Sequence, residues 1–311
     1  MTPWPIKFRW QRFAIVALLA ALAGCNGSGS SPELVWGKRG VQPGQLVKPR
    51  AIAIGPDDRM YLVDWTARIQ AFDRHGKYLN VQWTPPDFRN GRPSGLSVDA
   101  KHNVIVSDSH YHAVRVYSPE GKLLQTIGGE PGTEPGQLGY ISDALRDEAG
   151  NFYASEFGEI QRISKFDPDG KFLKCWGTGG TEQGQFARIR GMTLGPDKHL
   201  YVADACNHRI QVFTTDGEFV RTFGTPGDKL GEFSYPYDVA IAPGRTPYLY
   251  VVEFGNCRVQ KLTLDGKSIG TWGTAGRAPG QLSSPWALAV DSRGRIHIAD
   301  SENDRVQRID F

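Results

Sequence analysis

An acidic residue and an arginine recur along this chain at a nearly constant separation. The acids are Asp64, Asp108, Glu156, Asp204, Glu253 and Asp300, and the arginines that follow five of them are Arg68, Arg162, Arg209, Arg258 and Arg305. Carboxylates collected in one place can hold a metal ion or transfer protons. One acid and one arginine in every unit indicate instead ion pairs that brace each loop through charge-assisted hydrogen bonds. We therefore interpret the five pairs as structural. Asp108, which has Ala113 where an arginine is expected, is interpreted as an acid free to meet a ligand.

These pairs belong to a unit that recurs about every 47 residues, a period typical of propellers, solenoids and arrays. A short glycine loop marks the unit: Pro43-Gly44-Gln45-Leu46 returns at 135–138, 184–186, 231–233 and 279–282. The interval between the first two copies is doubled, so we expect one degenerate copy near residues 90–94.

Each unit contains four short apolar segments and no helical periodicity. In residues 183–224 these segments are separated by turn residues, and the last turn, Asp216-Gly217, is a hairpin signal. Six such units predict an all-β fold, a six-bladed β-propeller of four-stranded antiparallel blades over residues 33–311. The sixth copy stops after its third strand at Phe311. Residues 33–37 match the fourth strand of other copies, so we expect them to complete that blade and close the ring.

The loops that carry the acids and the glycine loops should share one face, because strand direction alternates within a blade. The innermost strands begin on that face at Arg50, Ser94, Ser142, Arg190, Tyr237 and Trp286. Asp143 and Asp238 come next in two of these strands, and Trp65 follows the first acid. With Asp108, these residues form the predicted ligand site at the channel mouth. Arginines, carboxylates and aromatic rings suit an anionic or polar ligand with flat or apolar parts. Ordinary variation of a propeller rim is the alternative.

The first residues have the pattern of a targeting segment. Lys7, Arg9 and Arg12 precede an apolar run of about eleven residues, which is typical of a secretory signal peptide. The run ends at Leu22-Ala23-Gly24-Cys25, which resembles a bacterial lipobox. The resemblance implies a signal peptide over residues 1–24, a lipid on Cys25 and a flexible tether over residues 25–32. It also implies a periplasm-facing place in the bacterial cell envelope, and Asn26 favours the outer membrane. An ordinary signal peptide followed by a chance cysteine is the alternative.

Loss of the signal peptide removes three of the 36 basic residues and leaves 33 basic against 33 acidic residues. Nucleic-acid binding needs a concentrated basic face, so we expect no nucleic-acid partner. Cys175, Cys206 and Cys257 remain in the mature chain, without the spacing of a zinc site. Cys206 and Cys257 occupy equivalent loops of adjacent copies, and the sequence leaves open whether they form a disulfide.

The third segment of the later copies opens with a family signature. Asn207-His208-Arg209 resembles the NHL repeat family, as do Asn256-Cys257-Arg258 and Asn303-Asp304-Arg305. The resemblance extends over residues 33–311, although the first three copies depart from the signature. Peptide-amidating lyases are similar in fold and bind zinc through histidines on the innermost strands. The matching positions here hold no histidine, so the resemblance does not carry a zinc site over to this chain. His110 and His112, beside Asp108, could hold a metal weakly.

These observations favour a binding or scaffold propeller over an enzyme. Ser94 and Ser142 have no evident histidine base, and we expect no catalytic residue. We expect no cofactor beyond a weakly held zinc or calcium ion. The hypothesis is a monomeric, lipid-anchored module that recognises a protein, a peptide or an anionic glycan on its long-loop face. A metal-dependent propeller enzyme of lyase, lactonase or hydrolase type is the alternative.

Overall fold

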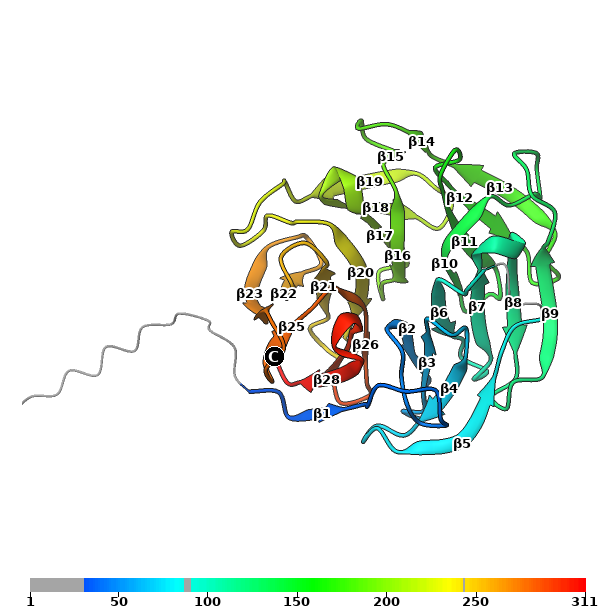
Figure 1. Ribbon diagram of the computed structural model, residues 1–311. Helices are drawn as coiled ribbons and strands as arrows, with labels where there is room; N and C mark the ends of the chain where they lie inside the picture. Colours follow the sequence, from blue (N-terminus) through cyan, green and yellow to red (C-terminus); the bar gives the residue numbers. More distant parts are fainter. Residues whose placement is uncertain (1–30, 87–90, 243) are drawn as a thin grey trace, which may run out of the picture.

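The computed structural model describes residues 31–86, 91–242 and 244–311. They form six four-stranded antiparallel sheets around a central channel (Figure 1). The first three blades are β2 (Pro49–Ile54), β3 (Met60–Asp64), β4 (Ile69–Phe72) and β5 (Tyr78–Trp83); β6 (Gly95–Val98), β7 (Val104–Asp108), β8 (Ala113–Tyr117) and β9 (Leu123–Gly128); and β10 (Tyr140–Arg146), β11 (Phe152–Phe157), β12 (Arg162–Phe166) and β13 (Phe172–Trp176). The all-β, six-bladed prediction is therefore confirmed.

The other three blades follow the same order. They are β16 (Ile189–Leu194), β17 (His199–Asp204), β18 (Arg209–Thr214) and β19 (Phe219–Phe223); β20 (Pro236–Ile241), β21 (Tyr248–Glu253), β22 (Arg258–Thr263) and β23 (Ser268–Trp272); and β26 (Pro285–Val290), β27 (Ile296–Asp300), β28 (Arg305–Ile309) and β1 (Leu34–Trp36). Two short parallel pairs precede the innermost strands of blades 4 and 6: β14 (Thr178–Gly179) with β15 (Gln185–Phe186), and β24 (Thr274–Ala275) with β25 (Gln281–Leu282). Three 3₁₀ turns are η2 (Ser109–Tyr111), η3 (Ala205–Asn207) and η4 (Ser301–Asn303).

The ring is closed by the first described strand. β1 pairs antiparallel with β28 over three residue pairs, from Leu34↔Arg308 to Trp36↔Val306, so it is slightly shorter than the predicted segment. The Trp36 ring then reaches blade 1, where its centroid lies 4.8 Å from that of Phe72. The seam therefore joins the two ends of the described chain through backbone pairing and through side-chain packing.

Neighbouring blades interlock at the hairpin between the third and fourth strands. A Cβ placed on the hairpin glycine would lie 2.4 to 2.6 Å from an aromatic ring of the preceding blade. The four such contacts are Gly76 with Trp36, Gly121 with Trp83, Gly217 with Trp176 and Gly266 with Phe223. These glycines also have positive φ, so both the turn and the packing require a residue without a side chain. The glycine of these hairpins is therefore required by packing between blades as well as by the local turn.

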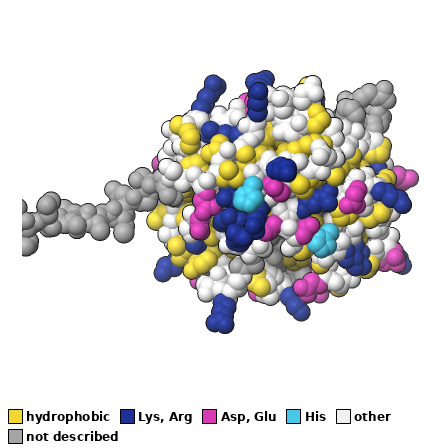
Figure 2. Space-filling model, turned by 90° about the horizontal axis from the view of Figure 1, so that it is seen from below, with side chains coloured by type: hydrophobic (Ala, Val, Ile, Leu, Met, Phe, Trp, Pro, Cys, Tyr) yellow, Lys and Arg dark blue, Asp and Glu magenta, His cyan; other side chains and the backbone are white. Residues whose placement is uncertain are grey.

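On the side of the ring shown in Figure 2, basic and acidic side chains are interspersed with apolar ones. Within the described residues, no helix is long and apolar enough to cross a membrane. Cys175, Cys206 and Cys257 are free, and Cys175 is exposed because it lies on the outermost strand of blade 3. The proposed signal peptide, Cys25 and nearly all of the tether lie outside the described residues.

Candidate functional site

The acid and arginine of each unit meet beneath the glycine loop. In blade 4, Nε of Arg209 lies 2.8 Å from Oδ2 of Asp204, whose side chain is fully buried. The Arg209 guanidinium also donates to the backbone oxygens of residues 181, 182 and 185, in the loop that enters the blade. Equivalent pairs are Asp64–Arg68 (2.6 Å), Glu156–Arg162 (2.9 Å), Glu253–Arg258 (2.5 Å) and Asp300–Arg305 (2.7 Å). The arginine of each pair thus ties the entering loop to the end of the second strand.

Asp108 is not the free acid that the sequence suggested. Its side chain is buried, and its Oδ2 lies 2.8 Å from Nε of Arg115. Arg115 lies two residues beyond Ala113, and residues i and i+2 of a strand project from the same face, so the brace has moved along β8. This alternation of side chains along a strand is the sequence feature that identifies Arg115 as a partner of Asp108. Asp108 is not among the residues that line the cavity described below.

The innermost strands of the six blades surround a cavity of about 230 Å³ in the channel. Eight residues that the sequence placed at or just inside the mouth line it: Arg50, Ser94, Ser142, Asp143, Arg190, Tyr237, Asp238 and Trp286. Trp65 lies at its edge, with 42% of its surface exposed, and its ring is 5.2 Å from the guanidinium carbon of Arg50. The repeat register therefore brings together residues from all six blades.

Two arginines stack on aromatic rings at this mouth. The guanidinium carbon of Arg190 lies 4.3 Å from the ring centroid of Tyr237 and 4.9 Å from that of Trp286. The guanidinium carbon of Arg50 also lies 4.9 Å from the Trp286 centroid, so the two groups are separated by at most twice that distance. Burial, together with the charges of Arg190 and Arg92, lowers the pKa of Arg50 to about 10. Burial lowers the pKa of Arg190 as well. Arginine side chains stay protonated in proteins, so both groups are cations.

Neither of these arginines forms a close ion pair. Across the described part of the chain, no Asp or Glu oxygen lies within 4.0 Å of the side-chain nitrogens of Arg50 or Arg190. Arg190 is only 9% exposed, and Nε of Arg50 is buried without a hydrogen-bond partner. This separates them from the five bracing arginines, each of which meets an acid. The mouth therefore presents two adjacent positive charges that form no close ion pair, although the charge of Asp238 acts on Arg190 from across the cavity.

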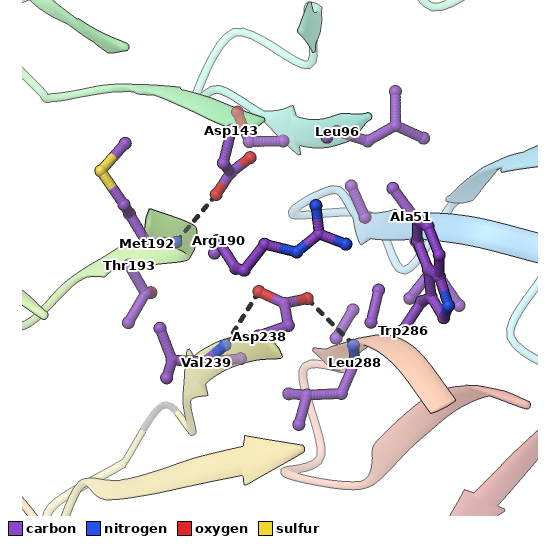
Figure 3. A pocket seen from close by; sticks show the side chains of 18 of the residues that line it. Ala51, Leu96, Asp143, Arg190, Met192, Thr193, Asp238, Val239, Trp286 and Leu288 are labelled. Atoms are coloured by element: carbon purple, nitrogen blue, oxygen red, sulfur yellow. Dashed lines mark hydrogen bonds between the residues drawn. The ribbon is translucent and has the colours of Figure 1, made fainter. Parts of the chain in front are cut away.

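Two carboxylates line the same cavity. Asp143 Oδ1 accepts from the backbone N–H of Ala144 (2.9 Å), and its Oδ2 accepts from that of Met192 in the next blade (2.9 Å). Asp238 Oδ1 accepts from Val239 (2.8 Å), and its Oδ2 accepts from Leu288 in the next blade (3.0 Å). Figure 3 shows the bonds to Met192, Val239 and Leu288, with the Arg190 side chain extending between the two carboxyl groups. Each carboxylate therefore joins two blades.

The residues equivalent to these two acids in the adjacent blades are small. A Cβ on Gly191 would lie 2.0 Å from Oδ1 of Asp238, and one on Gly95 would lie 2.5 Å from Oδ1 of Asp143. Burial raises the pKa of Asp143 to about 7. Burial and then the charge of Asp143 raise the pKa of Asp238 well above its ordinary range. Burial therefore favours the protonated form of both carboxyl groups. The alternation of Gly and Asp along the repeat was the sequence signal for this arrangement.

Histidines are held apart from the cavity. Within residues 31–86, 91–242 and 244–311, no group of three or more His, Cys, Asp or Glu side chains is arranged to hold a metal ion. The rings of His110 and His112 instead pack against Tyr140, at 5.9 and 5.4 Å between centroids. Nδ1 of His112 also lies 2.9 Å from the backbone oxygen of Gly139.

One serine has the sequence spacing of a nucleophile elbow. Gly266-Lys267-Ser268-Ile269-Gly270 matches Gly-x-Ser-x-Gly, a pattern that we expect between a strand and a helix. Here Ser268 begins β23, the outermost strand of blade 5, and its Oγ donates to Oε1 of Gln260 at 2.9 Å. Ser268 lies outside the channel lining, so the match is a matter of spacing alone.

Comparisons with known proteins agree with the repeat and the fold. The NHL repeat family matches residues 186–213 and 282–309, which are parts of blades 4 and 6. Mouse peptidyl-glycine alpha-amidating monooxygenase is 36% identical over 129 residues, covering 38% of this chain and 13% of that protein. The Drosophila melanogaster protein brain tumor is 28% identical over 86 residues, covering 27% of this chain and 8% of that protein. The chain therefore matches only a small part of the length of these relatives.

Solved structures match much more of the chain. A streptogramin B lyase structure has a TM-score of 0.60 and 16% identity, covering 84% of this chain and 92% of that one. The hydrazine synthase of Kuenenia stuttgartiensis has a TM-score of 0.59 and 14% identity, covering 85% and 83%. At these identities the likeness shows the fold alone.

Proposed function

We propose that this NHL-repeat propeller is a binding module that seats an anionic group of its ligand between Arg50 and Arg190. The seat lies at the channel mouth on the long-loop face. A protein, a peptide or an anionic glycan would supply the anion, and the surrounding loops would contact the rest of the ligand.

The observation that carries this proposal is that Arg50 and Arg190 line one cavity and neither forms a close ion pair with a carboxylate. A buried charge without a partner is unfavourable, and an anion placed between the two guanidinium groups would offset both their repulsion and their desolvation. Stacking holds the faces of each guanidinium against aromatic rings and leaves its N–H edges to donate to ligand oxygens. Trp286, which both arginines contact, would fix the spacing of the two donors.

Thermal shift with benzoate and benzamide tests the seat, because the two probes share a flat ring and differ in charge. Benzoate should raise the Tm of the wild-type protein, and benzamide should not. The R50M/R190M variant should lose the response, whereas R277M, which removes an exposed arginine, should keep it. An equal response to both probes, or an unchanged response of R50M/R190M, would refute the anion seat.

We propose further that the propeller is tethered in a bacterial envelope by a lipid on Cys25. The lipobox-like run before Cys25 supports this proposal. Metabolic labelling with an alkyne fatty acid in a bacterial host should label the wild-type protein and not C25A. Labelling of C25A, or none of the wild type, would contradict it. Cell fractionation of the labelled protein then distinguishes the outer membrane, which we favour, from the inner one.

The second candidate is a metal-dependent enzyme of lyase, lactonase or hydrolase type. It is favoured by the two carboxylates, Asp143 and Asp238, that line the cavity. Elemental analysis of protein purified without chelators separates the two functions. Stoichiometric zinc or calcium that is absent from D143N/D238N would replace the binding proposal with the enzymatic one.

A further inference from the structure

The channel holds charges of both signs side by side. Arg50 and Arg190 supply two cations, Asp143 and Asp238 supply two carboxyl groups, and all four line one cavity. We propose that the ligand group bound there is a compact zwitterion, whose carboxylate meets the two arginines and whose protonated amine meets Asp143 and Asp238. This inference rests on the anion seat proposed above and adds the chemical class of the ligand.

The arrangement in the cavity places the two parts of such a ligand a short distance apart. The Arg190 side chain extends between the two carboxyl groups and carries its guanidinium toward Ala51 and Trp286 (Figure 3). A ligand carboxylate at the guanidinium would therefore have its neighbouring atoms beside the acids. The cavity volume of about 230 Å³ is smaller than pockets for drug-sized ligands, so the group that enters is small.

Both acids retain acceptor capacity for an amine. Each carboxylate oxygen accepts one backbone N–H in the bonds described above, and a carboxylate offers about four acceptor positions in all. Asp238 is only partly buried, and it faces the cavity rather than the outer surface. Glycine at 95 and 191 leaves room for the carboxyl groups themselves, since a Cβ there would lie 2.5 Å from Oδ1 of Asp143 or 2.0 Å from Oδ1 of Asp238. An ammonium group could thus donate to both acids without displacing the bonds that join the blades.

Charge balance distinguishes a zwitterion from a simple anion. Among the described residues of the lining, the other titratable groups are Arg50, Arg190 and Tyr237, and His110 faces Arg50 from blade 2. With one proton on the acid pair, the four groups carry a net charge of about +1 and are neutralised by a simple anion. With both acids ionised they are neutral, and a zwitterion preserves that balance. Binding of a zwitterion near neutral pH should therefore release a proton from the acid pair.

Three probes that share a phenethyl group test the inference: phenylalanine, 3-phenylpropionate and phenethylamine. Calorimetric titration at pH 8 should show phenylalanine binding roughly tenfold more tightly than 3-phenylpropionate, and phenethylamine should bind most weakly. The preference for phenylalanine should shrink at pH 6, where the acid pair holds its proton. Titrations near pH 7 in Tris and in HEPES should show that phenylalanine releases protons and that 3-phenylpropionate releases none.

Variants separate this inference from the proposed function. D238N and D143N should each lose the preference for phenylalanine and still bind 3-phenylpropionate, and two single variants guard against a folding defect in one. R50M/R190M should bind neither probe, whereas R277M should behave as the wild type. Equal binding of the two acids by the wild type, with loss of both in R50M/R190M, would keep the anion seat and refute the zwitterion. No binding of any probe at millimolar concentration, or unchanged binding by R50M/R190M, would overturn both.

Discussion

Replacing Arg209 with methionine should destabilise the propeller by about 3 kcal/mol. Its partner Asp204 is fully buried, and removing one member of a buried ion pair costs about 3–5 kcal/mol because the other charge is left without a partner. Asp204 would still accept hydrogen bonds from Ala187 N and from Asn207 Nδ2, so we expect the lower end of this range. A loss of about 3 kcal/mol corresponds to a decrease in Tm of roughly 6–12 °C for a domain of this size.

Equilibrium unfolding in urea, followed by tryptophan fluorescence, measures this loss. R277M removes an exposed arginine and should change the free energy of unfolding by no more than about 0.5 kcal/mol. D204N/R209M also removes the buried charge and should recover much of the stability. If R209M loses less than about 1 kcal/mol, the pair is no stronger than an exposed salt bridge. The brace interpretation would then be wrong.

The loss should also depend on pH. Burial raises the pKa of Asp204, and its hydrogen bonds and the charge of Arg209 act against that rise. Without Arg209 the folded-state pKa should rise further above the unfolded value, so the folded protein binds a proton that the unfolded chain does not. The stability of R209M should therefore fall as pH rises from about 4 through that folded-state pKa. A difference from the wild type that is larger at pH 5 than at pH 8 would contradict this reasoning.

Three further changes test the ring and the channel. W36A removes the ring that packs across the seam onto blade 1 and should lower the free energy of unfolding in urea by roughly 2–4 kcal/mol. An unchanged midpoint would show that the seam contributes little to stability. G217A places a Cβ 2.5 Å from the indole ring of Trp176 at a φ of 81° and should lower the free energy of unfolding by roughly 2–4 kcal/mol. G280A is the control, because Gly280 has a φ of 87° and no atom within 4 Å of the added Cβ, and it should cost about 1 kcal/mol. Equal losses would refute the packing role of Gly217. The pKa of Asp143 is raised to about 7, so its contribution to the free energy of unfolding is greatest below pH 4 and falls by up to roughly 4 kcal/mol between about pH 4 and 7. Urea titrations across this pH range should show that D143N lacks this fall. His297, whose pKa is lowered by burial, contributes a slope of opposite sign in both proteins, so identical pH profiles of D143N and the wild type would contradict the raised pKa of Asp143.

Repetition made the fold accessible from the sequence. Each strand appears six times, so a weak alternation in one copy is supported by the others at the same register. The same register placed Arg50, Arg190 and Trp286 around one mouth, because the start of an innermost strand is a fixed position in every copy. Repetition does not predict the contacts between different side chains at those equivalent positions. The stacking of both arginines on Trp286 depends on side-chain conformation across blades.

The differences from the sequence-based expectations also have physical causes. Asp108 is paired because Arg115 reaches it from the next residue on the same strand face, at a spacing that differs from that of the other five pairs. The sequence does not reveal the bonds of Asp143 and Asp238 to the following blades. Those bonds connect segments about 50 residues apart, a separation at which local pattern carries no signal. The glycines that leave room for these carboxyl groups, at positions 95 and 191, are the sequence feature that indicates the arrangement.

The seam has a mechanical consequence. Any tension applied through the chain that precedes residue 31 is carried first by β1, which is held by three residue pairs, by the packing of Trp36 and by the ion pair between Glu33 and Arg308. All other blades are loaded only after that strand has detached. A force applied from this end would therefore open the ring between β1 and β28 first. At that stage the other five blades would keep all four of their strands.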